Sequence, residues 1–366
     1  MTSAEGSDAP SGSSVEIRGV TLREVRSVIP AGCYVRSRRR AIALLAFDVA
    51  LYGIAIVGVL RSPPLAALGF GVLAGFAVAF LFVWGHDACH GALFESRHLS
   101  EVLGTAAMLP SLQMYRLWAF GHNKVHHGFT SLSSVDWICR PMSPDEYGAA
   151  SLWRRLVYRL ERHPATCGLH YLLRVWWPGM VTFRPDPRAR RTRGFRLSQL
   201  GMLFYLSTFS IVTYRTGGWV AVVAAVVLPF VVFTYLIAFF VYLHHTHPDI
   251  PFFGKRSEWS ATVGQLCCST VVRCSRPVEW LTHNIFVHTP HHVDSRIPFY
   301  NLHEAHQGLQ RTYGHLITQY RFRWSTVRSI FARCQLYDFD RHTWHTFAQQ
   351  RRSVDRVQSR SAITRR

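Results

Sequence analysis

Long apolar runs alternate with polar, arginine-rich segments along this chain. Residues 41–60 contain one charged side chain, Asp48, and residues 64–84 contain none. Residues 196–214 and 219–243 form a second pair of apolar runs, and a short connection joins the two members of each pair. About 20 apolar residues in a helix cross the hydrocarbon core of a bilayer. The pattern therefore predicts two membrane-spanning helical hairpins.

Basic residues are distributed unevenly around these runs. The connections at 61–64 and 215–218 carry one Arg each, whereas the segment 85–194 and the two chain ends carry nearly all the others. Cytoplasmic segments of membrane proteins are enriched in Lys and Arg. We therefore expect an all-α integral membrane protein with about four transmembrane helices in two hairpins and a cytoplasmic helical cap.

The ends of the chain differ in composition from its middle. We expect a disordered polar tail over residues 1–35, one membrane domain over 36–345 and a basic tail over 346–366. No apolar segment follows an early basic stretch, so we expect no cleaved signal peptide.

The overall composition supports a membrane protein. Charged residues make up 17% of the chain and hydrophobic residues 49%, whereas soluble chains are about a quarter charged. The net charge of +20 is typical of nucleic-acid binding as well, but the Arg residues flank apolar runs and no nucleic-acid-binding motif accompanies them. We therefore expect no nucleic-acid partner. The eight Cys show no paired CxxC spacing, which argues against a zinc site or a disulfide framework.

Twenty histidines occur, and many of them lie in four clusters. Three clusters, hereafter boxes, read HDACH at 86–90, HNKVHH at 122–127 and HTPHH at 288–292, and HHTH follows the last apolar run at 244–247. Under the four-helix topology, all three boxes lie on the same side of the membrane.

The spacing within the boxes predicts which imidazoles share a direction. Residues four apart lie on one face of an α-helix. His86 and His90 should therefore point the same way. His122 and His126 should do so as well, with His127 beside them. In the third box, a helix is expected to begin at Thr289–Pro290, with His288 just outside it.

Neutral imidazole is a good ligand for iron, copper, nickel and zinc. Eight imidazoles are too many for one ion and suit two, and structural zinc sites favour Cys and four ligands. The boxes therefore predict a pair of redox-active metal ions. Asp87 and Asp294 are candidates for orienting the ring N–H groups, and His283 is a candidate for either that role or a place beside the substrate.

Longer segments around these boxes resemble a known family. HDACHGALF, WAFGHNKVHHGFTS and HNIFVHTPHHVDSRIPFYNL resemble the three histidine boxes of the membrane fatty acid desaturase superfamily, and LHHTHPDIPFF has a counterpart there. The similarity runs from about residue 40 to 320. It is greatest to the acyl-lipid omega-6, or delta-12, fatty acid desaturases of bacteria, cyanobacteria and plants.

This resemblance implies a fatty acid desaturase with two iron ions, which uses O₂ and two electrons to form a cis double bond in a lipid-linked acyl chain. Position by position, it implies the metal ligands His86, His90, His122, His126, His127, His288, His291 and His292. It also implies a further ligand after the last apolar run, for which His245 matches best and His247 second. His244 departs from the family, because plant members often have Gln there.

The expected partners are a membrane lipid that carries the acyl substrate and an external electron donor, either a ferredoxin or a cytochrome b5-like protein. The sequence has no flavin, haem or iron–sulfur motif of its own. The basic face could bind an acidic carrier or anionic lipid. We expect a multi-pass protein of a bacterial inner membrane, with its termini and active site cytoplasmic. No feature predicts an oligomeric state.

Two other functions remain open at this point. The same di-iron scaffold supports fatty-acyl or carotenoid hydroxylases and ketolases, although HVDSRIPFYNL resembles the acyl-lipid desaturases more. A non-catalytic membrane metal-binding protein would need ionisable side chains along its spans. Away from the ends of the predicted spans, Asp48 is the one charged residue, which is a poor match to such a protein.

Overall fold

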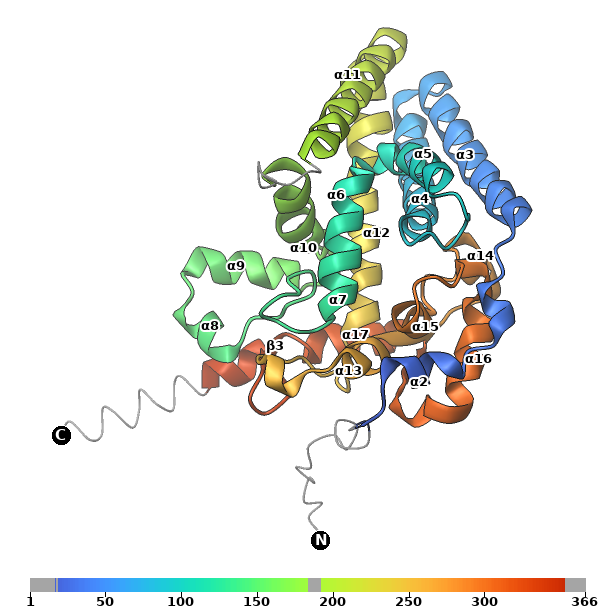
Figure 1. The fold of residues 1–366 in the computed structure, drawn as a ribbon. Helices are drawn as coiled ribbons and strands as arrows, with labels where there is room; N and C mark the ends of the chain where they lie inside the picture. The colour runs from blue at the N-terminus through green and yellow to red at the C-terminus, as the bar shows by residue number, and fades with distance from the viewer. Residues whose placement is uncertain (1–16, 18, 184–191, 353–366) are drawn as a thin grey trace, which may run out of the picture.

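The computed structural model describes residue 17, residues 19–183 and residues 192–352. Long apolar helices fill the upper part of Figure 1, and shorter helices gather beneath them. The long elements are α3 (Arg38–Arg61), α4 (Pro64–Cys89), α11 (Thr192–Val222), the π-helix η5 (Val223–Val227) and α12 (Leu228–His245).

Three of the described helices are long and apolar enough to cross a membrane. They are Arg38–Arg61, Pro64–Cys89 and the 52-residue run Gly194–His245, with mean hydropathies of 2.3, 2.4 and 2.7. The first predicted hairpin corresponds to α3 and α4. The second predicted pair forms one helical run, whose backbone leaves helical geometry at Gly218 (φ 66°, ψ −161°), inside the predicted turn.

Helix α4 packs between α3 and α12. A Cβ at Gly71 would lie 2.4 Å from the carbonyl oxygen of Ala224, and one at Gly75 would lie 2.4 Å from Cβ of Val232. The two glycines are four residues apart and share a helix face, so they allow the close approach that small residues give to membrane helices. This packing brings the histidine-bearing ends of α4 and α12 together.

The segment between α4 and α11 forms short helices. They are α5 (Arg97–Met108), η2 (Leu109–Ser111), α6 (Tyr115–Phe120), the π-helix η3 (Gly121–His126), α7 (His127–Phe129), α8 (Pro144–Ala149), α9 (Leu152–Glu161), α10 (Gly168–His170) and the π-helix η4 (Tyr171–Val181). Of these, α5 lies beside α4, and α6 and α7 lie beside α12 (Figure 1).

The segment after α12 closes the lower end of the molecule. Its helices are η6 (Arg256–Glu258), α13 (Ala261–Cys267), α14 (Arg276–Leu281), α15 (His288–Val293), η7 (Phe299–Asn301), α16 (Leu302–Tyr313), η8 (Gly314–Leu316) and α17 (Trp324–Arg333). Its strands are β1 (Thr270–Arg273), β2 (Thr318–Arg321), β3 (Leu336–Asp338) and β4 (Thr343–His345).

The fold is mostly helical, as predicted, but it is not strictly all-α. Strand β1 pairs in parallel with β2, placing Thr270 opposite Thr318, and β3 pairs antiparallel with β4. The β-branched sequence Thr270–Val271–Val272 favours an extended backbone. Strands this short are difficult to detect in a chain dominated by helical periodicity.

The predicted N-terminal tail does not extend to residue 35. Helix α2 (Leu22–Ser27) and the 3₁₀ turn η1 (Ala31–Tyr34) lie within it. A reciprocal capping box between Thr21 and Glu24 starts α2, Val25 is buried, and Nε of Arg26 donates to the carbonyl of Val293 at 2.8 Å. Residues 347–352 are helical, whereas the remainder of the predicted C-terminal tail lies outside the described residues.

Candidate metal centre

Nine histidines come together where α4, η3, α7, α12 and α15 meet. They form two groups, and within each group the potential ligand atoms all lie within 4.8 Å of one another. Group one consists of His86, His90, His122, His127 and His291, and group two consists of His126, His245, His288 and His292. Every histidine of the three boxes belongs to one group or the other.

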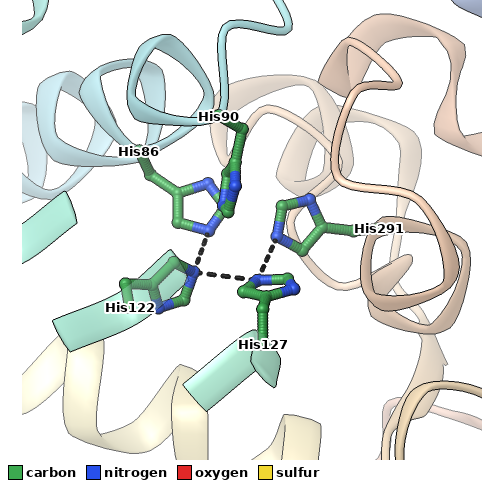
Figure 2. Close-up of side chains that lie close together, drawn as sticks. All are labelled: His86, His90, His122, His127 and His291. Atoms are coloured by element: carbon green, nitrogen blue, oxygen red, sulfur yellow. Dashed lines mark hydrogen bonds between the residues drawn. The ribbon is translucent and has the colours of Figure 1, made fainter. Parts of the chain in front are cut away.

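Figure 2 shows the five imidazoles of group one around a common centre. The Nε2 atom of His122 lies 3.0 Å from Nε2 of His86 and 3.1 Å from Nε2 of His127. Nε2 of His127 lies 3.2 Å from Nε2 of His291. The remaining member, His90, has a buried Nε2 with no hydrogen-bond partner among the described residues. Three chain segments thus direct ring nitrogens at one point.

Group two is fully buried and lies beside group one. Nε2 of His126 is 3.2 Å from Nε2 of His245, and Nε2 of His292 is 3.1 Å from Nε2 of His288. The ring of His292 stacks on that of His127 from group one, with 4.3 Å between the centroids. The two groups therefore offer two adjacent positions for metal ions.

A π-helix divides the second box between the two groups. The prediction that His122 and His126 point the same way holds only in part: their ring centroids lie 5.3 Å apart, but the two rings belong to different groups, because η3 replaces the expected α-helix. At its end the N–H of His127 donates to the carbonyl of His122, five residues earlier. Residues five apart therefore lie on one face, which brings His122 and His127 into group one and leaves His126 to group two. Such π-helical turns frequently occur at functional sites.

Hydrogen bonds outside group two fix two of its tautomers. Nδ1–H of His126 donates to Oδ2 of Asp136 at 3.0 Å, and Nδ1–H of His245 donates to the carbonyl oxygen of Cys268 at 2.9 Å. Carboxylate and carbonyl oxygens only accept, so Nε2 of each ring has a lone pair and no hydrogen. These lone pairs face each other at 3.2 Å, where they repel. A cation bound by both would remove that repulsion, so the donor set fits a metal ion.

Comparable contacts orient one ring in each group. Nδ1 of His292 lies 3.1 Å from Oε1 of Gln265 and 3.2 Å from Oγ1 of Thr130. In group one, Nδ1–H of His86 donates to Oδ1 of Asp87 at 2.9 Å. In both cases the hydrogen lies on Nδ1, which leaves Nε2 free to bind a metal.

Burial keeps five imidazoles of the second and third boxes neutral. Desolvation, reinforced by the neighbouring imidazoles, holds the pKa of His122, His127, His288 and His292 well below the usual value of 6.5. It lowers the pKa of His291 to about 3. Because neutral imidazole is the form that binds metals, these side chains are ready for metal at neutral pH.

The two acidic candidates lie in different surroundings. Asp87 contacts His86, as described above, and its Oδ2 accepts from the N–H of Phe299 at 2.7 Å. Asp294 does not orient a ring among the described residues. Its carboxylate accepts from Nε and Nη2 of Arg296 at 2.8 and 2.6 Å and from the hydroxyl of Tyr34 at 3.2 Å. Asp294 therefore contacts Arg296, two residues later in the chain, where we expected it to contact a histidine.

His283 belongs to neither group. Its Nε2–H donates to Oδ2 of Asp48 at 2.7 Å, and both side chains are buried. Asp48, a charged residue inside the first predicted span, thus has a partner from the segment before the third box. The pair connects α3 to the segment between α14 and α15.

The cluster at the end of α12 contributes only His245 to the groups. His244 is buried and stacks on His288, with 3.9 Å between the centroids, and neither ring nitrogen has a partner among the described residues. Nδ1 of His247 lies 3.3 Å from Oδ2 of Asp249, and its ring stacks on Tyr320. His247 is therefore removed from both groups.

Three side chains that hold group two were not anticipated from the sequence. Asp136, Gln265 and Thr130 occupy no recognisable spacing relative to the boxes. The available signal is weak: Asp136 is the first acidic residue after the second box. Gln265 lies far along the chain on α13, and only the fold brings it to His292.

An apolar cavity of about 340 Å³ adjoins both groups. The histidines lining it are His86, His122, His126, His244, His245 and His288, and its other walls include Phe82, Leu117, Trp118, Tyr171, Val175, Ile237, Phe240 and Ile285. Trp118 stacks on His122, with 4.2 Å between the centroids. Apolar walls with a few polar groups at one end are typical of small-molecule sites, and these walls suit an alkyl chain.

The chain is similar to known proteins over most of its length. Residues 62–324, which include both histidine groups, match the family described as fatty acid desaturase. The chain is 29% identical to the chloroplastic omega-6 fatty acid desaturase of Glycine max, across 87% of this chain and 74% of that protein. It is 28% identical to the sn-1 oleoyl-lipid 12-desaturase of Synechocystis sp., across 92% of this chain and 95% of that protein. The predicted resemblance is thereby confirmed.

Proposed function

Since the chain belongs to the fatty acid desaturase family and is an oxidoreductase acting on acyl lipids, we propose that it forms a cis double bond at a centre of two iron ions. The observation that supports this most strongly is the pair of histidine groups beside one apolar cavity. Two groups of imidazoles without Cys suit iron better than structural zinc.

Group one would hold one iron ion and group two the other. Bound iron would supply, with O₂ and two electrons, an oxidant strong enough for unactivated C–H bonds, which no protein side chain provides. The overall reaction consumes one O₂, two electrons and two protons for each double bond and yields two waters. The chain holds the ligands in place through Asp87, Asp136 and the carbonyl of Cys268.

The cavity positions the acyl chain. Its aromatic and aliphatic walls exclude water and place one stretch of the alkyl chain against the histidines that line the cavity. Trp118, held against His122, forms part of the wall nearest to group one. Because the walls fix which methylenes lie beside the metal centre, they determine the position of the double bond.

The proposed substrate is an oleoyl chain on a membrane glycerolipid. The name of the Synechocystis relative specifies an oleoyl lipid and the twelfth position, and its alignment covers nearly all of both chains. The electron donor is a separate ferredoxin or cytochrome b5-like protein. Desaturation, and not hydroxylation, is favoured by the names of the relatives.

The proposed topology has both termini and the metal centre on the cytoplasmic side of a bacterial inner membrane. A straight helix of 52 residues would measure about 78 Å, more than twice the roughly 30 Å of a hydrocarbon core. With its chain reversal at Gly218, the run Gly194–His245 would cross twice and restore the four predicted spans.

Lipid analysis of an expressing host tests the proposal. A bacterium that makes oleate and co-expresses a ferredoxin and its reductase would receive the wild type, His291→Ala or His98→Ala. His98 is an exposed histidine outside both groups. We expect a new dienoic chain, seen by gas chromatography–mass spectrometry, with the wild type and His98→Ala only. A hydroxylated chain would assign the protein to the hydroxylases, and an unchanged lipid profile from iron-loaded protein would contradict catalysis on acyl chains.

A further inference from the structure

A second large pocket opens between α9 and α17. Its volume is about 700 Å³, and it shares no lining residue with the cavity beside the histidine groups. Among the residues that line it in the described part of the chain none is acidic. We call it the basic pocket, because the basic residues that line it are Arg159, Arg162, His163, Arg328, Arg351 and Arg352.

Arg162 lines the basic pocket, and no acidic side chain in the described part of the chain forms an ion pair with it. It is 4% exposed, and its buried Nε and Nη2 have no hydrogen-bond partner within the described ranges. Its guanidinium lies over the rings of Tyr158 and Tyr242, 5.4 and 5.5 Å from the centroids. A cation removed from water needs an opposite charge or strong hydrogen bonds.

Neighbouring arginines show what Arg162 lacks. Arg140 pairs with Glu146, and Nε of Arg174 lies 2.8 Å from Oε1 of Glu161. Arg162 also borders an internal cavity of about 20 Å³, which has room for one water. A water can accept a hydrogen bond from the guanidinium but brings no charge. The compensating anion therefore has to enter from the basic pocket.

The surroundings of the pocket indicate where that anion comes from. On α9, Leu152, Trp153, Leu156 and Leu160 form an exposed apolar face, with Leu152 82% and Trp153 71% exposed. Helix α9 runs across the direction of α12 in Figure 1. An amphipathic helix in this orientation, with Arg on its other side, is typical of the membrane interface. Trp324, the first residue of α17, is also exposed, as interfacial Trp commonly is.

We propose that the basic pocket binds the phosphate group of an anionic membrane lipid. The planar guanidinium of Arg matches the oxygens of a phosphate with parallel hydrogen bonds. The adjoining apolar face of α9 can contact the acyl chains of the same molecule. An acidic protein would meet the charges but would leave this apolar face in water, so the lipid accounts for both features. The site is separate from the acyl substrate and does not depend on catalysis.

Lipid binding to the purified full chain in non-ionic detergent tests the site. Native mass spectrometry would compare phosphatidylglycerol with phosphatidylcholine of identical acyl chains, so that binding through the acyl chains cancels. The variant Arg328→Gln/Arg351→Gln removes two charges of the pocket, and Arg97→Gln/Arg341→Gln removes two exposed charges elsewhere. We expect roughly tenfold or more weaker phosphatidylglycerol binding in the first variant and no change in the second.

A variant of the buried Arg162 provides a second test, in which the melting temperature is measured. Phosphatidylglycerol should raise the melting temperature of the wild type but not that of Arg162→Gln. An equal rise in both, or equal lipid binding by the two double variants, would overturn the proposal. Full displacement of the lipid by millimolar inorganic phosphate would assign the pocket to a free anion instead. Slower ferredoxin-dependent turnover of Arg328→Gln/Arg351→Gln, with unchanged lipid binding, would assign it to the electron carrier.

Discussion

Replacing Asp136 by asparagine removes a negative charge beside His126 and leaves the size of the side chain almost unchanged. Oδ2 of Asp136 accepts from Nδ1 of His126 and from the N–H of Ser131, and Oδ1 accepts from the N–H of Ile138. An amide can accept at only one of these positions. The ring of His126 therefore loses a charged acceptor, and Nε2 becomes a weaker ligand.

The loss of metal affinity in Asp136→Asn should be confined to group two. Removing a carboxylate that orients a metal-binding histidine weakens metal binding roughly 10- to 100-fold, or about 1.4–2.7 kcal/mol. Group one should be unaffected, because its own carboxylate contact is between His86 and Asp87. Wild-type protein should bind two metal ions per chain, and Asp136→Asn should bind one tightly and one weakly.

An anaerobic Fe(II) titration against a competing chelator, with metal counted per chain, measures this difference. Asp145→Asn is the matched control, because Asp145 is exposed on α8 and belongs to neither group. Melting temperatures of the metal-free proteins would show whether the fold is intact. If Asp136→Asn retained both ions at wild-type affinity, or released both together, the division into two sites held by separate contacts would be wrong.

Three further predictions concern pH, the cavity and the chain reversal. Burial places the pKa of His292 well below 6.5, so the unfolded chain gains a proton there below about pH 6.5 and the folded chain does not. The free energy of unfolding and the metal content should therefore be highest above about pH 6.5 and fall as the pH drops below it. Metal per chain between pH 5 and 8 measures this, and a constant content would contradict it. Val175→Phe should fill the cavity and abolish desaturation with the metal content unchanged, whereas Leu173→Phe, which lies outside the cavity, should leave the lipid profile of a host as in wild type. Gly218→Ala should lower the free energy of unfolding by about 1–3 kcal/mol, because the φ of 66° at this position favours glycine. Gly53→Ala is the control, because a Cβ there meets no atom, and it should not lower the melting temperature. Equal melting temperatures for the two variants would refute the strain at Gly218.

The sequence identified the participants in the site more reliably than their arrangement. The three boxes were recognised because several histidines recur at short spacing in three segments, and His245 was recognised from the resemblance to the desaturase family; all nine side chains lie in the two groups. Their division between two groups was not found, because nothing in HNKVHH marks a π-helix instead of an α-helix. The local pattern specifies which residues are present, whereas the backbone hydrogen bonds of η3 determine which way each one faces.

The contacts beyond the boxes depend on tertiary packing. Asp136, Gln265 and the carbonyl of Cys268 reach the rings from segments whose own sequence gives no sign of that role. The same applies to Asp294, which appeared well placed beside the third box but pairs with Arg296 instead. An acidic neighbour in the sequence is therefore weak grounds for predicting contact with a metal ligand.

The membrane part of the fold was the more predictable, since apolar runs of about 20 residues have few alternatives to a spanning helix. The N-terminal segment was less so. Its Ser- and Gly-rich start resembles a disordered tail, yet Val25 and Cys33 are buried farther along. A segment with two buried side chains and one capping box has nearly the composition of a polar tail, so composition alone does not show that it is folded.

The most direct test of the central claim is a single-turnover reaction. Protein purified without O₂ would be loaded with iron, reduced chemically, and mixed with O₂ and an oleoyl lipid, and its product and iron content would be measured by mass spectrometry. The account predicts two iron ions per chain and a product that has lost two hydrogens, at up to one double bond for each pair of iron ions. Full activity with one iron ion per chain, or a product that has gained oxygen, would contradict it.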